Sequence, residues 1–362
     1  MSATTLKLRH RIANVVLRFA YYGRVPVLDL STSDAEAHER PRLVIASHRN
    51  GAFDGQQVLA AFPKVQFLVS IQLLRHWFLR LFVAGIPVVR PKDVERYGRD
   101  PAAEASPVEA GCAHLRAGGD LGIFPEGSSD WGFRPQSYQR GAARIVCALA
   151  QEGLEVDVIP VGLFYSTPGR FRSRAQVVRG PSVRLPSRGD QGLKTWESMV
   201  AEELARALDE VSVNCPDQET FDRIQAQSLH IARTSKPHLA STRAVFARSF
   251  LQLQRDVAAD RVSIDFLGAA RGGHRVYAWW RWVCLVLMWV FAPVLAVAAF
   301  AGSRADARNT VTFFRMLGGA AAALIWIPVL IVLGFFFPWL MAAGLVCSVI
   351  GWLLLGMRRI RL

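Results

Sequence analysis

Two long stretches without a charged side chain, both near the end of the sequence, constrain the fold most. Residues 283–301 form the first, which contains Pro293, and the 42 residues of 316–357 form the second. At about 1.5 Å per helical residue, the second stretch measures about 63 Å, enough for two crossings of a hydrocarbon core of about 30 Å. The sequence therefore predicts a membrane-embedded tail over 276–362. It contains a helical hairpin over 316–357 that turns near 335–338 and a re-entrant or spanning segment over 283–301.

Arginines flank both uncharged stretches. They form three clusters: Arg271, Arg275 and Arg281; Arg304, Arg308 and Arg315; and Arg358, Arg359 and Arg361. Arginines next to membrane segments favour the cytoplasmic side, and all three clusters stay there if the first segment dips in and returns at Pro293. We therefore expect the protein in the inner (cytoplasmic) membrane, with the domain that precedes the tail on the cytoplasmic side. The alternative is three ordinary crossings with the C-terminus outside.

The charge of the chain narrows the class of partner. The 362 residues carry a formal net charge of +14, and the isoelectric point is about 10.3. Such charge suits nucleic acid, an anionic membrane surface or a phosphorylated substrate. Because membrane-length apolar stretches are present and no nucleic-acid module is recognisable, we expect membrane phospholipids and no nucleic acid. The five cysteines show no CxxC spacing, so neither a metal site nor a disulfide framework is expected.

Residues 1–24 are predicted to form an amphipathic helix on the membrane surface. The apolar Leu8, Ile12, Val15, Val16 and Phe19 recur at helical spacing opposite Arg9, Arg11 and Arg18. No small-residue cleavage site follows, so a signal peptide is not expected. The alternative is a helix packed against the rest of the domain.

Between these regions, short β-branched stretches alternate with helical ones, which predicts an α/β domain over 25–212. The expected strands are 43–47, 65–70, 86–89, 121–124, 156–162 and 175–179, and the expected helices are 55–62, 72–84, 101–116, 138–151 and 196–211. Residues 213–275 are predicted to be a helical linker without a readable role.

Polar side chains follow several of these strands. "SHRNGAFDGQQ" places His48 and Asp54 after the first strand, and "GIPVVRPKD" places Arg90 after the third. "FPEGSSD" places Glu126 and Gly127 after the fourth, and "VIPVGLFY" is itself a strand. Ligands of α/β proteins bind outside the carboxyl ends of the strands, so these groups are expected to converge there. Taken alone, a histidine after a strand is more often structural than catalytic.

The four stretches, in this order and spacing, resemble the four motifs of the glycerophosphate and lysophospholipid acyltransferases, over about residues 25–190. The resemblance implies an α/β fold with a mixed sheet flanked by helices, and transfer of an acyl group from a thioester to a hydroxyl. It implies His48 and Asp54 as catalytic residues. The substrate-binding residues that it implies are Arg90, Glu126, Gly127 and Arg140. No cofactor is implied, since the thioester of coenzyme A or of acyl carrier protein is a co-substrate.

The chemistry of such a reaction fits these residue types. A glycerol hydroxyl is a poor nucleophile at neutral pH, and a base that removes its proton contributes on the order of 10²–10⁴-fold. Imidazole suits this task, and a carboxylate on its second nitrogen fixes the tautomer. His48 is therefore expected to be the base and Asp54 its partner. No GxSxG sequence occurs, which disfavours a serine hydrolase.

Two departures from the family pattern leave the acceptor open. Five residues separate His48 from Asp54, where four are usual, and Gly51 is expected to absorb the extra residue. Ser129 stands where many members carry a phosphate-binding arginine. Glycerol 3-phosphate and 1-acylglycerol 3-phosphate are both candidate acceptors in phospholipid synthesis. The alternatives are another lysophospholipid acceptor, or a non-catalytic lipid-binding membrane protein with the same fold.

Overall fold

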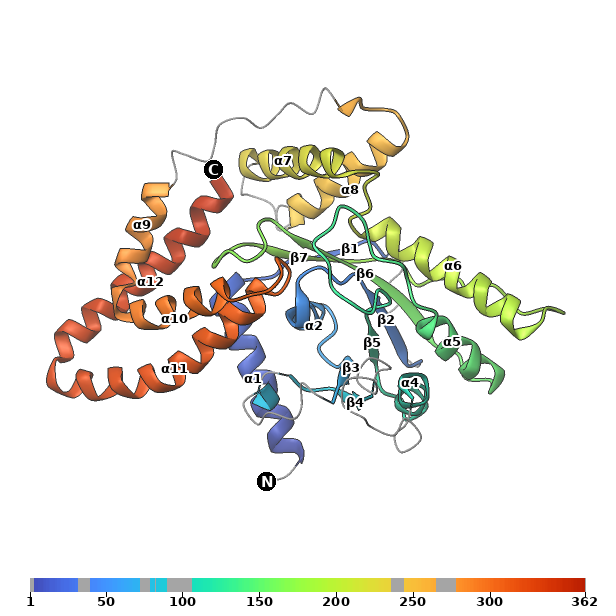
Figure 1. The fold of residues 1–362 in the computed structure, drawn as a ribbon, viewed down its shortest axis with the longest axis horizontal. Coiled ribbons are helices and arrows are strands. Elements are labelled where there is room, and N and C mark those ends of the chain that lie inside the picture. Colours follow the sequence, from blue (N-terminus) through green and yellow to red (C-terminus); the bar gives the residue numbers. More distant parts are fainter. Residues whose placement is uncertain are drawn as a thin grey trace.

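The computed structural model describes residues 3–31, 40–71, 79–81, 83–89, 106–235, 244–264 and 278–361. A seven-stranded sheet lies at the centre, in the order β1-β7-β6-β2-β5-β3-β4 (Figure 1). Its strands are β1 (Val27–Asp29), β2 (Arg42–Ala46), β3 (Gln66–Ser70), β4 (Ile86–Val88), β5 (Leu121–Ile123), β6 (Asp157–Tyr165) and β7 (Ala175–Arg179). The β6–β7 pair is antiparallel and the other pairs are parallel, so the expected mixed sheet is confirmed.

The parallel register places the ends of β2, β5 and β6 at one edge of the sheet. Leu43 pairs with Leu121 of β5 and with Val158 of β6, so the three strands run side by side in the same direction. Each is almost completely buried, as expected for strands with helices on both faces. The residues that follow these strands therefore meet at this edge.

Four helices of the predicted domain are described: α2 (Asp54–Val58), α4 (Pro107–Arg116), α5 (Gly141–Gln151) and α6 (Leu193–Val211). A capping box begins α4, in which Ser106 and Glu109 each bind the other's backbone N–H. The prediction started α5 three residues too early, at Tyr138, because the backbone N–H of Gln139 instead donates to the Pro125 carbonyl, at 2.7 Å. The expected helix 72–84 lies largely outside the described residues, as do residues 101–105 of the next one.

Two helices follow in the segment predicted as a linker: α7 (Gln218–Thr234) and α8 (Val245–Ala258). Phe221 of α7 and Phe250 of α8 are buried in the same hydrophobic core as the sheet. Phe250 packs edge-on against Phe164 of β6, with ring centroids 5.6 Å apart. These helices therefore belong to the packing of the domain.

The N-terminal helix α1 (Ala3–Tyr22) turns its polar side inward. The Arg18 guanidinium donates to the Gln56 carbonyl at 2.9 Å, and the Gln56 amide donates to Asn14 at 2.6 Å. On the other side, Val16 and Phe19 are more than half exposed. An apolar face that the protein leaves uncovered is the arrangement of a helix lying on a lipid surface.

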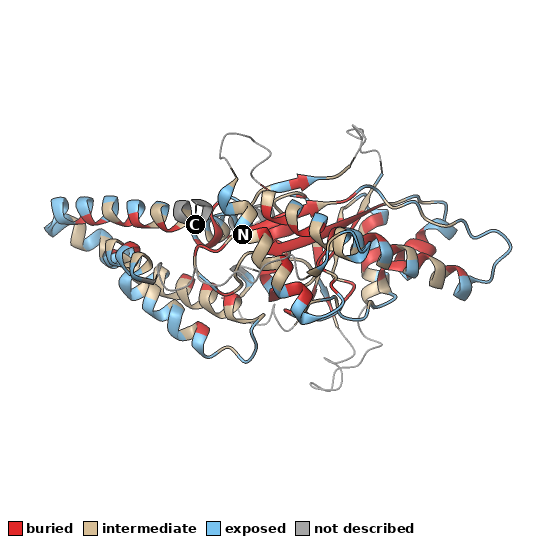
Figure 2. Cartoon of the chain, turned by 90° about the horizontal axis from the view of Figure 1, so that it is seen from above, coloured by how far each residue is buried: buried red, intermediate tan, exposed pale blue. Residues whose placement is uncertain are grey.

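The tail consists of α9 (Ala278–Leu287), η6 (Trp289–Phe291), α10 (Ala292–Ser303), α11 (Val311–Phe336) and α12 (Pro338–Arg361). Helices α11 and α12 are each long and apolar enough to cross a membrane, and they separate at Phe337, within the stretch predicted to turn. Few of their residues are buried, most being intermediate or exposed (Figure 2), and Trp339 at the turn is 87% exposed. Lipid is the solvent that suits such a surface.

Between α9 and α10 the chain bends by 80°. Gly351 of α12 approaches Cys284 of α9, whereas Gly318 of α11 approaches Ala301 of α10. Both ends of the bent pair therefore lie at the same end of the hairpin, next to the catalytic domain. At the bend, the Val290 carbonyl accepts a hydrogen bond of 2.7 Å from the Trp326 indole of α11. The hairpin thus satisfies a backbone group that the bend leaves free.

Candidate active site

His48 and Asp54 form the centre of the site. His48 follows β2, and Gly51 then turns the chain with a φ of +68°, into η1 (Gly51–Phe53) and α2. This turn brings the Asp54 carboxylate to 2.9 Å from His48 Nδ1. Glycine adopts positive φ without a steric penalty, so the five-residue spacing still allows the pair to form.

Asp54 is completely buried and accepts four hydrogen bonds. Its Oδ2 accepts from the backbone N–H groups of Arg49 and Asn50, each at 2.7 Å, in addition to His48 Nδ1. Its Oδ1 accepts from the Tyr165 hydroxyl. Burial, followed by the nearby Asp54 charge, raises the pKa of Tyr165 well above its ordinary value, so the hydroxyl stays protonated and donates.

These contacts determine how His48 is presented. A carboxylate that only accepts hydrogen bonds requires Nδ1 to be the donor, which leaves the lone pair of the neutral ring on Nε2. The ring stacks on Phe124, with centroids 4.3 Å apart, and Phe124 stacks on Phe67. The His48 side chain is 16% exposed, so the imidazole is fixed in place and still accessible.

Glu126, at the end of β5, is nearly buried and binds backbone groups. Its Oε1 accepts from the His48 N–H at 2.7 Å, and its Oε2 accepts from the Gln136 N–H at 3.1 Å. Burial raises the pKa of this carboxyl, although the two hydrogen bonds oppose the shift. The next residue, Gly127, has a φ of +68°. Glu126 therefore holds the His48 backbone, and the substrate-binding role expected for Glu126 and Gly127 stays a prediction.

Arg49 is a buried cation that the sequence interpretation overlooked. Its guanidinium donates to the Gly132 carbonyl at 2.8 Å and lies over the Trp131 ring, 4.6 Å from the centroid. Burial lowers its pKa to about 10, and the charges of Glu126 and Asp54 limit the decrease. Arg49 thus balances two buried carboxylates beside His48. Its position next to the histidine in "SHRN" was the available signal.

The membrane tail reaches this site through the loop between α10 and α11. The Asn309 amide donates to the Ser129 carbonyl at 2.6 Å and to the Ser129 hydroxyl at 2.8 Å. The Asn309 carbonyl lies 2.9 Å from where a Cβ on Gly51 would be. The Arg308 guanidinium lies over the Trp131 ring, 5.7 Å from its centroid. The tail therefore contacts both loops that carry the candidate catalytic groups.

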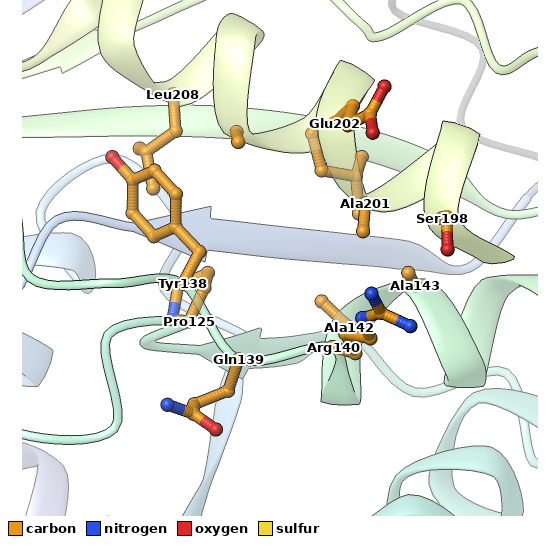
Figure 3. Close-up of a pocket in the computed structure, with 12 residues that line it drawn as sticks. Pro125, Tyr138, Gln139, Arg140, Ala142, Ala143, Ser198, Ala201, Glu202 and Leu208 are labelled. Carbon is orange, nitrogen blue, oxygen red and sulfur yellow. The ribbon is translucent and has the colours of Figure 1, made fainter.

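Of the two expected phosphate-binding arginines, the structure describes only Arg140. Arg90 lies outside the described residues. Arg140, exposed at the start of α5, lines a pocket of about 230 Å³ between α5 and α6 (Figure 3). Pro125 and Ala201 also line this pocket, but His48, Asp54 and Glu126 do not. The role of Arg140 therefore stays a prediction.

Comparison with known proteins supports the resemblance seen in the motifs. No protein-family model matches the chain. Glycerol-3-phosphate O-acyltransferase 2 of Saccharomyces cerevisiae is 32% identical over 121 residues, which are 31% of this chain and 16% of that protein. Glycerol-3-phosphate O-acyltransferase 1 of the same yeast is 28% identical over 120 residues, again covering 16% of its length. The chain thus matches about a sixth of the length of these curated relatives.

Among solved structures, the chain is similar to PlsC, the 1-acyl-sn-glycerophosphate acyltransferase from Thermotoga maritima. The TM-score is 0.35 at 15% sequence identity, over 56% of this chain and 78% of that one. The matches to the two yeast enzymes confirm the resemblance that the motifs indicate and support the glycerophosphate acyltransferase family for this chain.

Proposed function

We propose that this protein is a membrane-bound O-acyltransferase that moves a fatty acyl chain from a thioester to a hydroxyl of a glycerol phosphate, with His48 as general base. The observation that carries the proposal is the His48–Asp54 pair. His48 Nδ1 is held at 2.9 Å by a carboxylate whose two oxygens both accept hydrogen bonds, and the His48 side chain is 16% exposed. Such a pair has the geometry of a base that accepts one proton and returns it.

In the proposed reaction, Nε2 of His48 removes the proton from the acceptor hydroxyl while its oxygen attacks the thioester carbonyl carbon. The buried Asp54 stabilises the imidazolium that forms. As the tetrahedral intermediate collapses, the C–S bond breaks and the thiol leaves with the proton from His48. Atoms and charge balance without a covalent bond to the enzyme.

Glycerol 3-phosphate is the acceptor we favour over 1-acylglycerol 3-phosphate. The two yeast relatives are named for glycerol 3-phosphate, which supports this choice. Arg90 and Arg140 are the residues we propose to bind its phosphate. The donor is a thioester of coenzyme A or of acyl carrier protein. We further propose a cytoplasmic catalytic domain, because both ends of the bent α9–α10 pair lie on its side of the hairpin.

An assay of the purified full chain in detergent tests the proposal. Thioesters of coenzyme A and of acyl carrier protein are each offered with glycerol 3-phosphate, its keto analogue, 1-acylglycerol 3-phosphate and lysophosphatidylcholine. We expect acceptor-dependent release of thiol that falls at least about 10²-fold in His48→Ala, because the variant lacks the base. His230→Ala, on an exposed part of α7, is the matched control and should keep its rate.

The outcomes separate the candidate functions. Lipid binding without thiol release from any donor would favour the non-catalytic alternative. A His48→Ala variant that is folded and retains more than about a tenth of the rate would exclude His48 as the base.

A further inference from the structure

Three arginines from separate parts of the chain meet where the catalytic domain joins the tail. Arg170 lies in the loop between β6 and β7 and Arg315 in α11. Arg281 lies in α9, one turn before Cys284, which Gly351 of α12 approaches. The charges of Arg170 and Arg315 act on Arg281. The loop is tied to α11, because the Gly169 N–H donates to the Thr312 hydroxyl at 3.2 Å and its carbonyl accepts from the Arg315 guanidinium. We call Arg170, Arg281 and Arg315 the arginine cluster.

The arginine cluster lacks a counter-charge in the described part of the chain. None of its three side chains forms an ion pair with a described aspartate or glutamate. Arg315 also has a buried Nε for which the described residues offer no acceptor. Like charges held together without an anion repel one another, so an anion at this position would be bound favourably.

Tyr21 gives a second, independent indication of a ligand. Tyr21 is 6% exposed, and its hydroxyl has no hydrogen bond of regular geometry within the described residues, although Thr312 and Arg315 lie within reach of it. The hydroxyl lies close to Arg315 and Arg281. A buried hydroxyl without a partner is uncommon, because leaving it unpaired costs free energy. An oxygen-rich anion among the three arginines would satisfy it.

The loop that carries Arg170 adds further positive charge and reaches the end of α12. Arg172 is buried, its Nε donates to the Trp352 carbonyl at 3.3 Å, and its guanidinium lies 3.7 Å from the Trp352 ring centroid. Its Nη1 is buried with no acceptor among the described residues. Burial lowers the pKa of Arg172 and of Arg174 to about 10, so both remain charged at neutral pH.

The position relative to the membrane segments indicates the kind of anion. Arg315 lies near the start of α11, Arg281 near the start of α9, and Trp352 near the end of α12, and these ends adjoin the catalytic domain (Figure 1). Arginine, tryptophan and tyrosine at the ends of membrane segments lie at the depth of the lipid head groups. The planar guanidinium groups match the oxygens of a phosphate.

We propose that the arginine cluster binds the phosphate of an anionic phospholipid of the surrounding membrane, with the Tyr21 hydroxyl as a further donor. The neighbouring tail leaves Trp282 and Phe300 more than half exposed, which provides apolar surface for the acyl chains. The ligand is thus a lipid, with its phosphate at the domain and its chains along the tail. In the part of the chain that the structure describes, none of the three arginines forms a hydrogen bond with His48 or Asp54, and the proposal does not depend on acyl transfer.

Calorimetric titration of the purified full chain in a neutral detergent tests this site. The probes are dioctanoyl phosphatidylglycerol, dioctanoyl phosphatidylcholine and inorganic phosphate. We expect phosphatidylglycerol to bind most tightly, and its Kd to rise about tenfold or more in the double variant Arg281→Gln/Arg315→Gln, because two charge-assisted contacts are lost. The double variant Arg184→Gln/Arg188→Gln removes the same charge at exposed positions before α6 and should leave the Kd unchanged.

Further titrations distinguish a bound lipid from free phosphate and the arginine cluster from the catalytic site. His48→Ala should bind phosphatidylglycerol like the wild type; a parallel loss would place the lipid in the catalytic site and overturn the proposal. Inorganic phosphate that binds as tightly as the lipid would show a free anion to be the ligand. Equal binding of phosphatidylcholine would show that the negative charge is not recognised. If the Arg281→Gln/Arg315→Gln variant fails to fold, the exposed Arg170→Gln replaces it, and an unchanged Kd there would also overturn the proposal.

Discussion

The edge of the sheet that carries Asp54 and Glu126, here called the catalytic edge, and the arginine cluster both contain buried polar side chains. They differ in how many of these side chains have hydrogen-bond partners within the protein. At the catalytic edge, all four carboxylate oxygens of Asp54 and Glu126 accept hydrogen bonds from the protein. At the arginine cluster, Tyr21 and Arg315 keep buried atoms that no described residue satisfies. A carboxylate whose oxygens are all bonded is held in one arrangement, whereas a buried donor without a partner leaves a position that a ligand can fill. The two carboxylates at the catalytic edge are therefore fixed in advance, whereas the proposed lipid would complete the arginine cluster.

Asp54→Asn should have the largest effect on activity, because it disrupts the four hydrogen bonds that Asp54 accepts. The amide replaces an acceptor oxygen with a donor, so it cannot serve Tyr165 and the three N–H groups together. The imidazole then loses its fixed tautomer, and we expect kcat/KM for acyl transfer to fall about 10³-fold or more. Steady-state kinetics measure this, with circular dichroism to confirm folding. A folded variant with less than about tenfold loss would show that Asp54 does not orient His48.

Tyr165→Phe removes one donor and leaves the rest of the network in place. Because one oxygen of Asp54 then lacks its partner inside the protein, we expect a loss of about 1–3 kcal/mol in unfolding free energy. Since Asp54 is then held less firmly, we also expect kcat/KM to fall about tenfold. This loss is equivalent to about 1.4 kcal/mol of transition-state stabilisation. Denaturant unfolding and kinetics on the same preparation measure both. Lost stability with unchanged activity would mean that Tyr165 is purely structural.

Gly51→Ala tests whether the membrane tail packs against the loop between His48 and Asp54. Gly51 and Gly127 share a φ of +68°, so alanine at either position should cost about 1–2 kcal/mol. At Gly51 the new Cβ would also lie 2.9 Å from the Asn309 carbonyl, whereas at Gly127 the nearest atom, Cγ of Gln139, is 3.5 Å away. We expect Gly51→Ala to lose more unfolding free energy than its control Gly127→Ala. Equal losses would contradict the close contact with the tail.

The sequence predicts best what is local. His48 and Asp54 are six positions apart and joined by one turn, so the pair could be predicted once the other three motifs were recognised. The uncharged stretch 316–357 likewise contains its own turn at Phe337. The strand β1 (Val27–Asp29) was missed, because three residues carry too little pattern and its place beside β7 is set by tertiary contacts.

Contacts between distant segments could not be predicted in the same way. Tyr165 reaches Asp54 across 111 positions because β6 runs beside β2 and extends three residues beyond the predicted end. Asn309 and Ser129 are 180 positions apart. Nothing in the composition of either segment signals that partnership, since both lie in polar loops. Only the packing of the tail on the domain places them together.

Glu126→Gln should have the smallest effect of these variants. It tests the same network through the pH dependence of the unfolding free energy. Because burial raises the pKa of Glu126 in the folded protein, the native state binds the proton more tightly than the unfolded chain does. The contribution of this carboxyl to stability is therefore fully present below its unfolded value of about 4.5, and it declines as the pH rises through the folded pKa. Glutamine does not titrate. We expect the difference in unfolding free energy, wild type minus Glu126→Gln, to be larger at pH 4 than at pH 8, as measured by denaturant unfolding in detergent. A larger difference at pH 8 would mean that the bonds from the His48 and Gln136 N–H groups outweigh the burial of the charge.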